Sequence, residues 1–160
     1  MAALFPDDIP DAAVYVKHFA AYLIGKPYRA RARGPDAFDC WGLCTYVWAR
    51  HFRLTDVPDV FIDPIDKRAV RERFARAVDD GSGTELVQAF EGCAVLMGRS
   101  RAPDHVGIYL AADGGGVLHS LEHVGVVFTK LGALKPNGLN VLGFYRPHGM
   151  QWPTSTSSAI

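Results

Sequence analysis

The sequence predicts an α+β domain in which N-terminal helices pack on an antiparallel sheet. In the first half of the chain, apolar residues recur at helical spacing. In the second half, short apolar or alternating runs are separated by turns, as in strands joined by hairpins. At 160 residues, 49% of them apolar, the chain is long enough to enclose one core. We therefore expect a single domain over residues 1–148 and a tail over residues 149–160 that is flexible or bound to a partner.

The composition argues against several classes of protein. The 17 basic side chains are balanced by 17 acidic ones, whereas a nucleic-acid-binding protein normally carries a basic excess. The three cysteines form no CxxC pair, so we expect neither a disulfide framework nor a zinc site, and we predict no metal and no cofactor. The N-terminus lacks the pattern of a signal peptide, and no apolar run is long enough to span a bilayer.

Three helices are expected in the first half. The first ends at Gly25, because glycine readily adopts the left-handed conformation at a helix C-terminus. The second begins after Asp39, which can cap it, and carries a wide apolar face. The third has an arginine-rich outer face, which usually indicates only contact with solvent, and a turn at residues 80–83 ends it. The three helices cover residues 11–24, 40–52 and 66–79.

Five strands are expected in the second half. Each is a short run of apolar or β-forming residues bounded by turn signals. In the run that begins at His105, β-branched and aromatic residues alternate with other residues. A triple-glycine turn at residues 114–116 follows this run. The five strands cover residues 93–97, 105–110, 117–120, 125–129 and 141–146.

Cys40 is the candidate nucleophile. As the first residue of the second helix, it lies at the positive end of the helix dipole, beside backbone N–H groups of the first turn. This environment favours the thiolate, which is the reactive form of cysteine. The alternative is that the thiol only fills space in the core. That interpretation suits Cys44 and Cys93 better, because both lie among apolar residues.

His105 and His119 are the candidate partners of the thiol, since a cysteine nucleophile needs a base and a group that orients the base. His105 opens one predicted strand and His119 ends the next, at similar distances from the turn between them. If these strands form a hairpin, the two imidazoles are neighbours across it. An isolated histidine on a strand is more often structural, and His123 is a rival for the orienting role. His18 and His51 are expected at the surface or at helix ends.

The segment before the second helix, residues 26–35, carries four basic side chains. It is either a substrate-facing loop with affinity for an anionic polymer or simply a solvated loop. Tyr28 follows Pro27, whose ring restricts the backbone and holds the chain extended. The hydroxyl of Tyr28 therefore either lines a cleft, or its ring packs.

Four short motifs stand in order along the chain. They are G-K-P-Y at residues 25–28, D-C-W-G-L at 39–43, H-V-G-I-Y at 105–109 and V-L-H-S at 117–120. In this order and spacing they resemble the motifs of the NlpC/P60 family of cysteine peptidases, and the resemblance covers roughly residues 11–147. It implies a papain-like fold, with the helix of the nucleophile packed on an antiparallel sheet.

The resemblance also implies a reaction, the hydrolysis of bacterial cell-wall peptides, commonly at the bond between γ-D-glutamate and a diamino acid. Carried over to this chain, it makes Cys40 the nucleophile, His105 the general base and acid, and His119 the residue that orients His105. The backbone N–H of Cys40 then contributes to an oxyanion hole.

The resemblance implies that Tyr28 and Asp39 bind the substrate, and we expect Trp41, next to Cys40, to be a third substrate-binding residue. Tyr28 lines the cleft, and Asp39 contacts the free amine of the stem peptide. Trp41 stands where members of the family usually have serine, so the standard subsite for the stem peptide is altered here. A second departure is Glu91-Gly92-Cys93, which replaces the usual G-D opening of the strand before the histidine strand.

Residues 34–43 and 144–147 look most like the members of the family carried by phage tails and gene transfer agents. This likeness implies a tail-tip component that is made in the bacterial cytoplasm without a signal peptide and acts in the periplasm or cell wall. Its expected partners are peptidoglycan peptides and tail-tip or baseplate proteins, with no nucleic acid and no membrane insertion. Two alternatives stay open: a catalytically silent structural or assembly protein of the tail tip, and an amidase-type wall-degrading toxin of the same fold.

Overall fold

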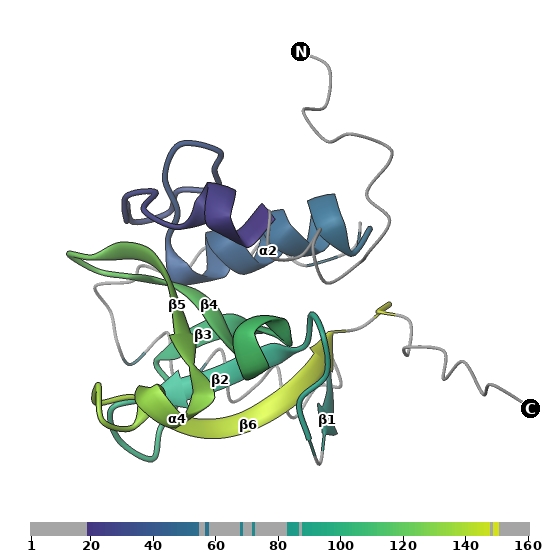
Figure 1. Cartoon of the computed structure of the whole chain (residues 1–160), viewed down its shortest axis with the longest axis vertical. Coiled ribbons are helices and arrows are strands. Elements are labelled where there is room, and N and C mark those ends of the chain that lie inside the picture. Colours follow the sequence, from purple (N-terminus) through teal and green to yellow (C-terminus); the bar gives the residue numbers. More distant parts are fainter. Residues whose placement is uncertain are drawn as a thin grey trace, which may run out of the picture.

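The computed structural model describes residues 19–54, 57, 68, 72, 83–86, 88–147 and 149–150. It has an α+β fold, in which a helical layer lies on one side of an antiparallel sheet (Figure 1). The predicted fold class is therefore confirmed. No helix among the described residues is long and apolar enough to cross a membrane.

The sheet has six strands, and every neighbouring pair is antiparallel. Their order across the sheet is β1-β6-β2-β3-β4-β5. The consecutive strands β3, β4 and β5 are neighbours and form a meander at one edge of the sheet. All five predicted strands are present within one or two residues of the expected bounds. The strands are β1 (Gly83–Leu86), β2 (Ala94–Gly98), β3 (His105–Leu110), β4 (Gly116–Leu121), β5 (Gly125–Lys130) and β6 (Asn140–Pro147).

β1 is the strand that the sequence pattern does not predict. Gly83 is expected in the turn after the third helix, but it pairs with Pro147 as the first residue of β1. The strand has only four residues, and one of them is the charged Glu85. It forms because β6 offers a free edge to it, and a pairing between segments so far apart in the sequence leaves no local signal.

Apolar side chains cover the sheet on both faces, and the alternation along each strand divides them between two clusters. On β3, Val106 and Ile108 belong to the cluster beneath α2, whereas Tyr109 packs with the second cluster. A short helix, α4 (Leu131–Leu134), contributes Leu134 to the second cluster. β2 is buried at all five positions. A strand that is buried on both faces has a continuous apolar sequence, which explains the run A-V-L-M-G.

α2 (Cys40–His51) is the helix predicted to begin at Cys40, and both of its ends are confirmed. At the N-terminus, the carboxylate of Asp39 accepts a hydrogen bond from the N–H of Gly42. At the C-terminus, the N–H of Phe52 donates to the carbonyl of Trp48. The apolar face of α2 is buried and packs against β3 and β4, which brings the helix onto the strands that carry the two candidate histidines.

The other two predicted helices are described only in part. Residues 19–23 are helical, and the chain leaves this helix at Gly25, whose φ of 90° lies in the left-handed region. Arg68 and Glu72 are also helical, and their Nε and Oε1 atoms form an ion pair at 2.9 Å. The remaining residues of both predictions, His18 among them, lie outside the described residues.

His51 is buried more deeply than the prediction of a surface or capping residue implies. Its ring stacks on that of Phe19, with the centroids 3.9 Å apart and the planes 13° apart. Burial lowers the pKa of His51 to about 4, and the neighbouring Arg50 lowers it further. The neutral ring therefore belongs to the packing between residues 19–23 and the end of α2.

Near the C-terminus, packing extends to Met150. Its side chain is buried in the cluster beneath α2, and its carbonyl accepts a hydrogen bond from Nη1 of Arg146 at 2.9 Å. The packed chain thus extends two residues beyond residue 148. Residues 151–160 of the predicted tail lie outside the described residues.

Candidate active site

Cys40 stands at the entrance of α2, half-buried, whereas Cys44 and Cys93 are fully buried. Burial raises the pKa of Cys44 well above its usual value and that of Cys93 to about 11. These two thiols are therefore protonated at neutral pH and shielded from reagents, as expected for residues that fill the core. The accessible thiol of the described residues is the one at the helix entrance.

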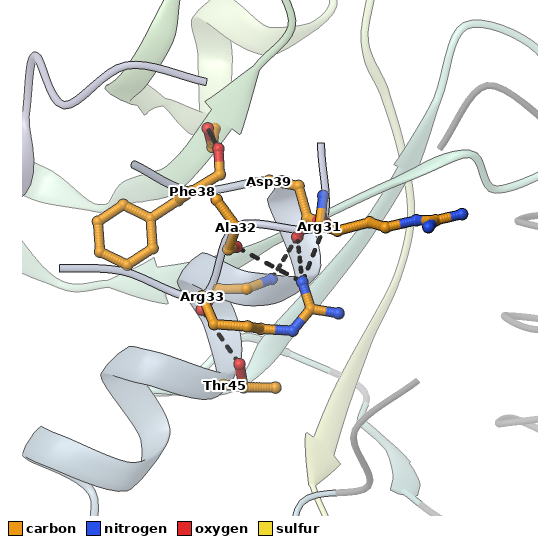
Figure 2. Close-up of polar contacts among 8 residues, drawn as sticks. Arg31, Ala32, Arg33, Phe38, Asp39 and Thr45 are labelled. Atoms are coloured by element: carbon orange, nitrogen blue, oxygen red, sulfur yellow. Dashed lines mark hydrogen bonds and ion pairs between the residues drawn. The ribbon is translucent and has the colours of Figure 1, made fainter. Parts of the chain in front are cut away.

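Asp39 fixes the loop that leads into α2 (Figure 2). Its Oδ1 accepts from the N–H of Gly42 at 2.6 Å, and its Oδ2 accepts from the N–H of Arg31 at 2.9 Å. Nη1 of Arg33 lies 3.1 and 3.0 Å from the two oxygens and forms an ion pair with them. Both carboxylate oxygens are thus used inside the protein. Contact of Asp39 with a substrate amine stays a prediction, and the structure gives this residue an organising role.

Gly42 allows the loop to lie against the first turn of α2. A Cβ on Gly42 would collide with the carbonyl oxygen of Ala32 and would approach Oδ1 of Asp39 to 3.0 Å. The same carbonyl of Ala32 accepts a hydrogen bond from the N–H of Asp39 at 3.2 Å. Arg31, which directly precedes Ala32, has a φ of 63°, a value that a residue with a side chain rarely adopts. The D-C-x-G-L motif therefore needs glycine at position 42 in this chain, because a side chain there would collide with the loop.

The loop is also tied to the sheet next to the candidate histidines. Phe38, two residues before Cys40, forms a parallel bridge with Tyr28, and its ring is fully buried. The hydroxyl of Ser120 donates to the carbonyl of Phe38 at 2.8 Å. Because Ser120 directly follows His119 on β4, this bond ties the loop before α2 to the strand that carries His119, while the two side chains point to opposite faces of the sheet.

His105 and His119 contact one another, as predicted. Nε2 of His105 and Nδ1 of His119 lie 2.8 Å apart, and both side chains are buried. The register of β3 with β4 pairs Ile108 with Leu118; continued by one residue, it sets His119 opposite Gly107 rather than opposite His105. The two histidines are therefore diagonal neighbours, a separation that two long side chains can bridge.

Gly107 makes room for this diagonal contact. A Cβ at this position would collide with Val117 and would lie 2.9 Å from the Cβ of His119. The glycine of the H-V-G-I-Y motif thus leaves space on the strand for the imidazole of His119. A larger residue would push this ring away from His105.

Thr129 extends the pair and was not among the predicted site residues. Its Oγ1 lies 2.9 Å from Nε2 of His119. The register of β4 with β5 pairs Val117 with Thr129 and His119 with Val127, so Thr129 is the next diagonal neighbour on the same face. Counting residues from the turn at 122–124 finds this position in the sequence, just as counting from the glycine turn finds His105 and His119.

His123, the rival for the orienting role, is exposed in the turn between β4 and β5. Its Nε2 lies 3.8 Å from Oε1 of Glu122. The contact with His105 is made by His119, so the choice of His119 over His123 agrees with the geometry.

Tyr28 lies close enough to Cys40 for the charge of the thiolate to affect the pKa of the phenol. Burial raises the pKa of Tyr28 to about 12, and the charges of Cys40 and Asp39 add to the rise. The phenol is therefore a neutral hydrogen-bond donor at any physiological pH. Trp41 is half-buried, and its ring packs edge-to-face on Trp48 with the centroids 5.7 Å apart. Both residues thus lie near Cys40, and the ring of Trp41 is packed.

The basic loop surrounds a hollow of about 310 Å³. Arg33, one of the basic residues of this loop, forms an ion pair with Asp39. Neither the substrate-facing loop nor the solvated loop considered from the sequence includes this ion pair. Among the described residues, no group of three or more histidine, cysteine or acidic side chains is arranged to hold a metal ion. The residues that line the hollow are Arg29, Ala30, Arg31, Ala32, Arg33, Gly34, Asp36 and Ala37.

The stability of the protein is expected to fall as the pH is lowered through the titration of His119. Burial lowers the pKa of His119 from 6.5 to about 4. The unfolded chain thus binds this proton at a higher pH than the folded chain does. The stabilisation is complete above pH 6.5 and is lost as the pH falls toward about 4. At about 1.4 kcal/mol per pKa unit, the free energy of unfolding changes by up to roughly 3 kcal/mol.

Urea unfolding of the wild type and of His119→Gln, on both sides of this pH window, measures the effect. The glutamine is neutral throughout, and the variant keeps His51 and Glu91, whose pKa values are also shifted by burial. We expect the wild type to lose more stability on acidification than the variant. Parallel losses in the two proteins would contradict the assignment.

The chain is similar to known proteins in sequence and in fold. Residues 25–133 match the model of the NlpC/P60 family, a span that includes Cys40, His105, His119 and Thr129. Among solved structures, the chain is similar to the NlpC/p60 domain of the peptidoglycan hydrolase SagA, at 21% sequence identity and a TM-score of 0.52. The match covers 85% of this chain and 98% of that one. No sequence among curated proteins matches the chain.

Proposed function

Because the chain belongs to the NlpC/P60 family, we propose that it is a cysteine peptidase that hydrolyses peptidoglycan stem peptides. One observation carries the proposal: the helix that begins at Cys40 packs on β3 and β4 and is tied to β4 through Phe38 and Ser120, and these two strands carry the hydrogen-bonded pair of His105 and His119. A thiol, a base and a group that orients the base are the three parts that nucleophilic acyl transfer needs. The solved relative is itself described as a peptidoglycan hydrolase.

The reaction proceeds through a thioester. The thiolate of Cys40 attacks the amide carbon, and the imidazolium of His105 gives its proton to the leaving amine as the C–N bond breaks. Water then attacks the thioester while His105 takes one of its protons, and the thiolate leaves as the carboxylic acid forms. The backbone N–H of Cys40, in the first turn of α2, is the candidate donor to the oxyanion.

The substrate side of the site is proposed to use Tyr28 and Trp41. Tyr28 supplies a phenol that stays neutral beside the nucleophile, so it can donate to a substrate carbonyl. Trp41 presents a large aromatic surface in the position next to Cys40. Asp39 is already bound by Arg33 and by two backbone N–H groups, so its proposed contact with the stem-peptide amine has the least support of the three.

The bond proposed to be cut is the one between γ-D-glutamate and the diamino acid. Mass spectrometry of fragments released from purified peptidoglycan tests this directly. We expect peptides that end in γ-D-glutamate together with peptides that begin with the free amine of the diamino acid. Cleavage between muramic acid and L-alanine would instead identify an amidase. Release no greater than that by a Cys40→Ala control would favour the catalytically silent alternative.

We also propose that the protein acts as a tail-tip component of a phage-like particle, made in the cytoplasm and active in the cell wall. The support is the resemblance of residues 34–43 and 144–147 to the members of the family carried by such tails. Tail particles purified from a producing strain should contain the chain, as detected by mass spectrometry. Its absence from them would remove the tail role and leave the peptidase proposal standing.

A further inference from the structure

Thr129 is placed to accept a hydrogen bond from one of the ring nitrogens of His119. Both ring nitrogens of His119 are engaged, Nδ1 with Nε2 of His105 at 2.8 Å and Nε2 with Oγ1 of Thr129 at 2.9 Å. We propose that Thr129 is a positioning residue that holds His119 in the tautomer protonated on Nε2, so that Nδ1 can accept a hydrogen bond from His105. The inference rests on the proposed function, because it concerns the orientation of the same base.

The direction of the hydrogen bonds follows from the chemistry of the base. When His105 takes up a proton it becomes an imidazolium, in which both ring nitrogens are donors. Its Nε2–H then needs an acceptor, and the atom at 2.8 Å is Nδ1 of His119. A neutral imidazole carries one N–H, so the proton of His119 must be on Nε2, where the hydroxyl oxygen of Thr129 accepts it. In the opposite tautomer, the Nδ1–H of His119 would face the Nε2–H of His105, and neither could accept a hydrogen bond.

The charge state of His119 fits this assignment. Burial lowers its pKa to about 4, so the ring is neutral at the pH at which His105 would act as a base. A protonated His119 would offer two donors and no acceptor to its neighbour. Two features of the structure thus agree: burial keeps the ring neutral, and the hydroxyl of Thr129 supplies an acceptor for the N–H that this tautomer places on Nε2.

The position of Thr129 is fixed by the sheet. Its backbone is part of the ladder in which Val117 pairs with Thr129 and Gly116 with Lys130. With His105 on β3, His119 on β4 and Thr129 on β5, the three side chains form one diagonal row across three neighbouring strands. A β-branched residue in a strand has few rotamers, so the hydroxyl is held toward His119 at little entropic cost.

The experiment is the pH dependence of Cys40 alkylation by iodoacetamide in the wild type, Thr129→Val and Thr129→Ser. Valine keeps the branched shape and removes the hydroxyl, whereas serine keeps the hydroxyl. Without the acceptor, the imidazolium of His105 is less stabilised, so the thiolate–imidazolium pair should exist over a narrower pH range. We expect Thr129→Val to narrow this range by about half to one pH unit and to lower the rate at its centre about 3-fold to 10-fold. Thr129→Ser should keep most of the wild-type pH range and most of the wild-type rate.

The outcomes separate the inference from the proposed function. If Cys40 is not the fast-reacting thiol of the wild type, the proposed function fails. If Cys40 reacts fast and Thr129→Val has the wild-type profile, only the role of Thr129 is refuted. A structural role alone would lower stability without moving the limbs of the profile. If Thr129→Val does not fold, the ¹⁵N chemical shifts of His119 in the wild type decide, since a proton on Nδ1 would overturn the assignment.

Discussion

Replacing Cys40 with alanine is expected to abolish the release of wall fragments while leaving the fold intact. The thiol is the only group of the site that can form the thioester, so its loss should reduce hydrolysis by roughly 10⁵-fold or more. The fold should survive because the capping and ion-pair contacts at this helix end belong to Asp39, Arg33 and Gly42. Fragment release from purified peptidoglycan measures the effect, and circular dichroism checks the fold.

The matched control for this variant is Cys93→Ala, which removes a thiol that is fully buried just before β2. This control should hydrolyse peptidoglycan at close to the wild-type rate, with at most a modest loss of stability. If Cys40→Ala released fragments as fast as the wild type, the proposed mechanism would be wrong. Equal losses in the two variants would point to a structural cause instead.

Replacing His119 with alanine should lower turnover by roughly 10²-fold to 10³-fold, whereas His123→Ala should leave it nearly unchanged. His119 holds His105 through a hydrogen bond of 2.8 Å, and its loss frees the ring of the base to leave its catalytic orientation. His123 is exposed and lies in a turn. Hydrolysis rates at pH values above the titration of His119 separate the catalytic loss from the effect on stability. A larger loss in His123→Ala would move the orienting role to that residue.

Much of the candidate site could be predicted because its parts are fixed by local rules. A capping aspartate followed by an apolar helical face places Cys40 at a helix entrance, whatever the rest of the chain does. A hairpin with alternating strands brings His105 and His119 together, because the number of residues on each side of the turn sets the register. These are short-range relations, and they are confirmed by the structure.

The features that were missed depend on contacts between distant segments or on a choice among possible partners. β1 exists because β6 pairs with it, across about sixty residues of sequence. The stacking of His51 on Phe19 joins two helical segments whose relative placement the sequence leaves open. Arg33 was one of four cations in an irregular loop, and only the folded loop shows that it binds Asp39.

Thr129 is a different case, since a local rule could have found it. The hairpin of β4 and β5 obeys the same counting as that of β3 and β4, and it sets Thr129 diagonally from His119. A threonine on a strand carries no chemical signal by itself, because β-branched residues are common there. Its significance comes from the imidazole next to it.

The most direct test of the account is the rate of thiol alkylation across pH in the wild type, Cys40→Ala and His105→Ala. The buried thiols of Cys44 and Cys93 have raised pKa values, so they should contribute little at acidic pH. We expect one fast-reacting thiol at acidic pH, which is lost in Cys40→Ala and slowed in His105→Ala. Uniformly slow alkylation with no contribution from Cys40 would contradict the account and favour an inert structural protein.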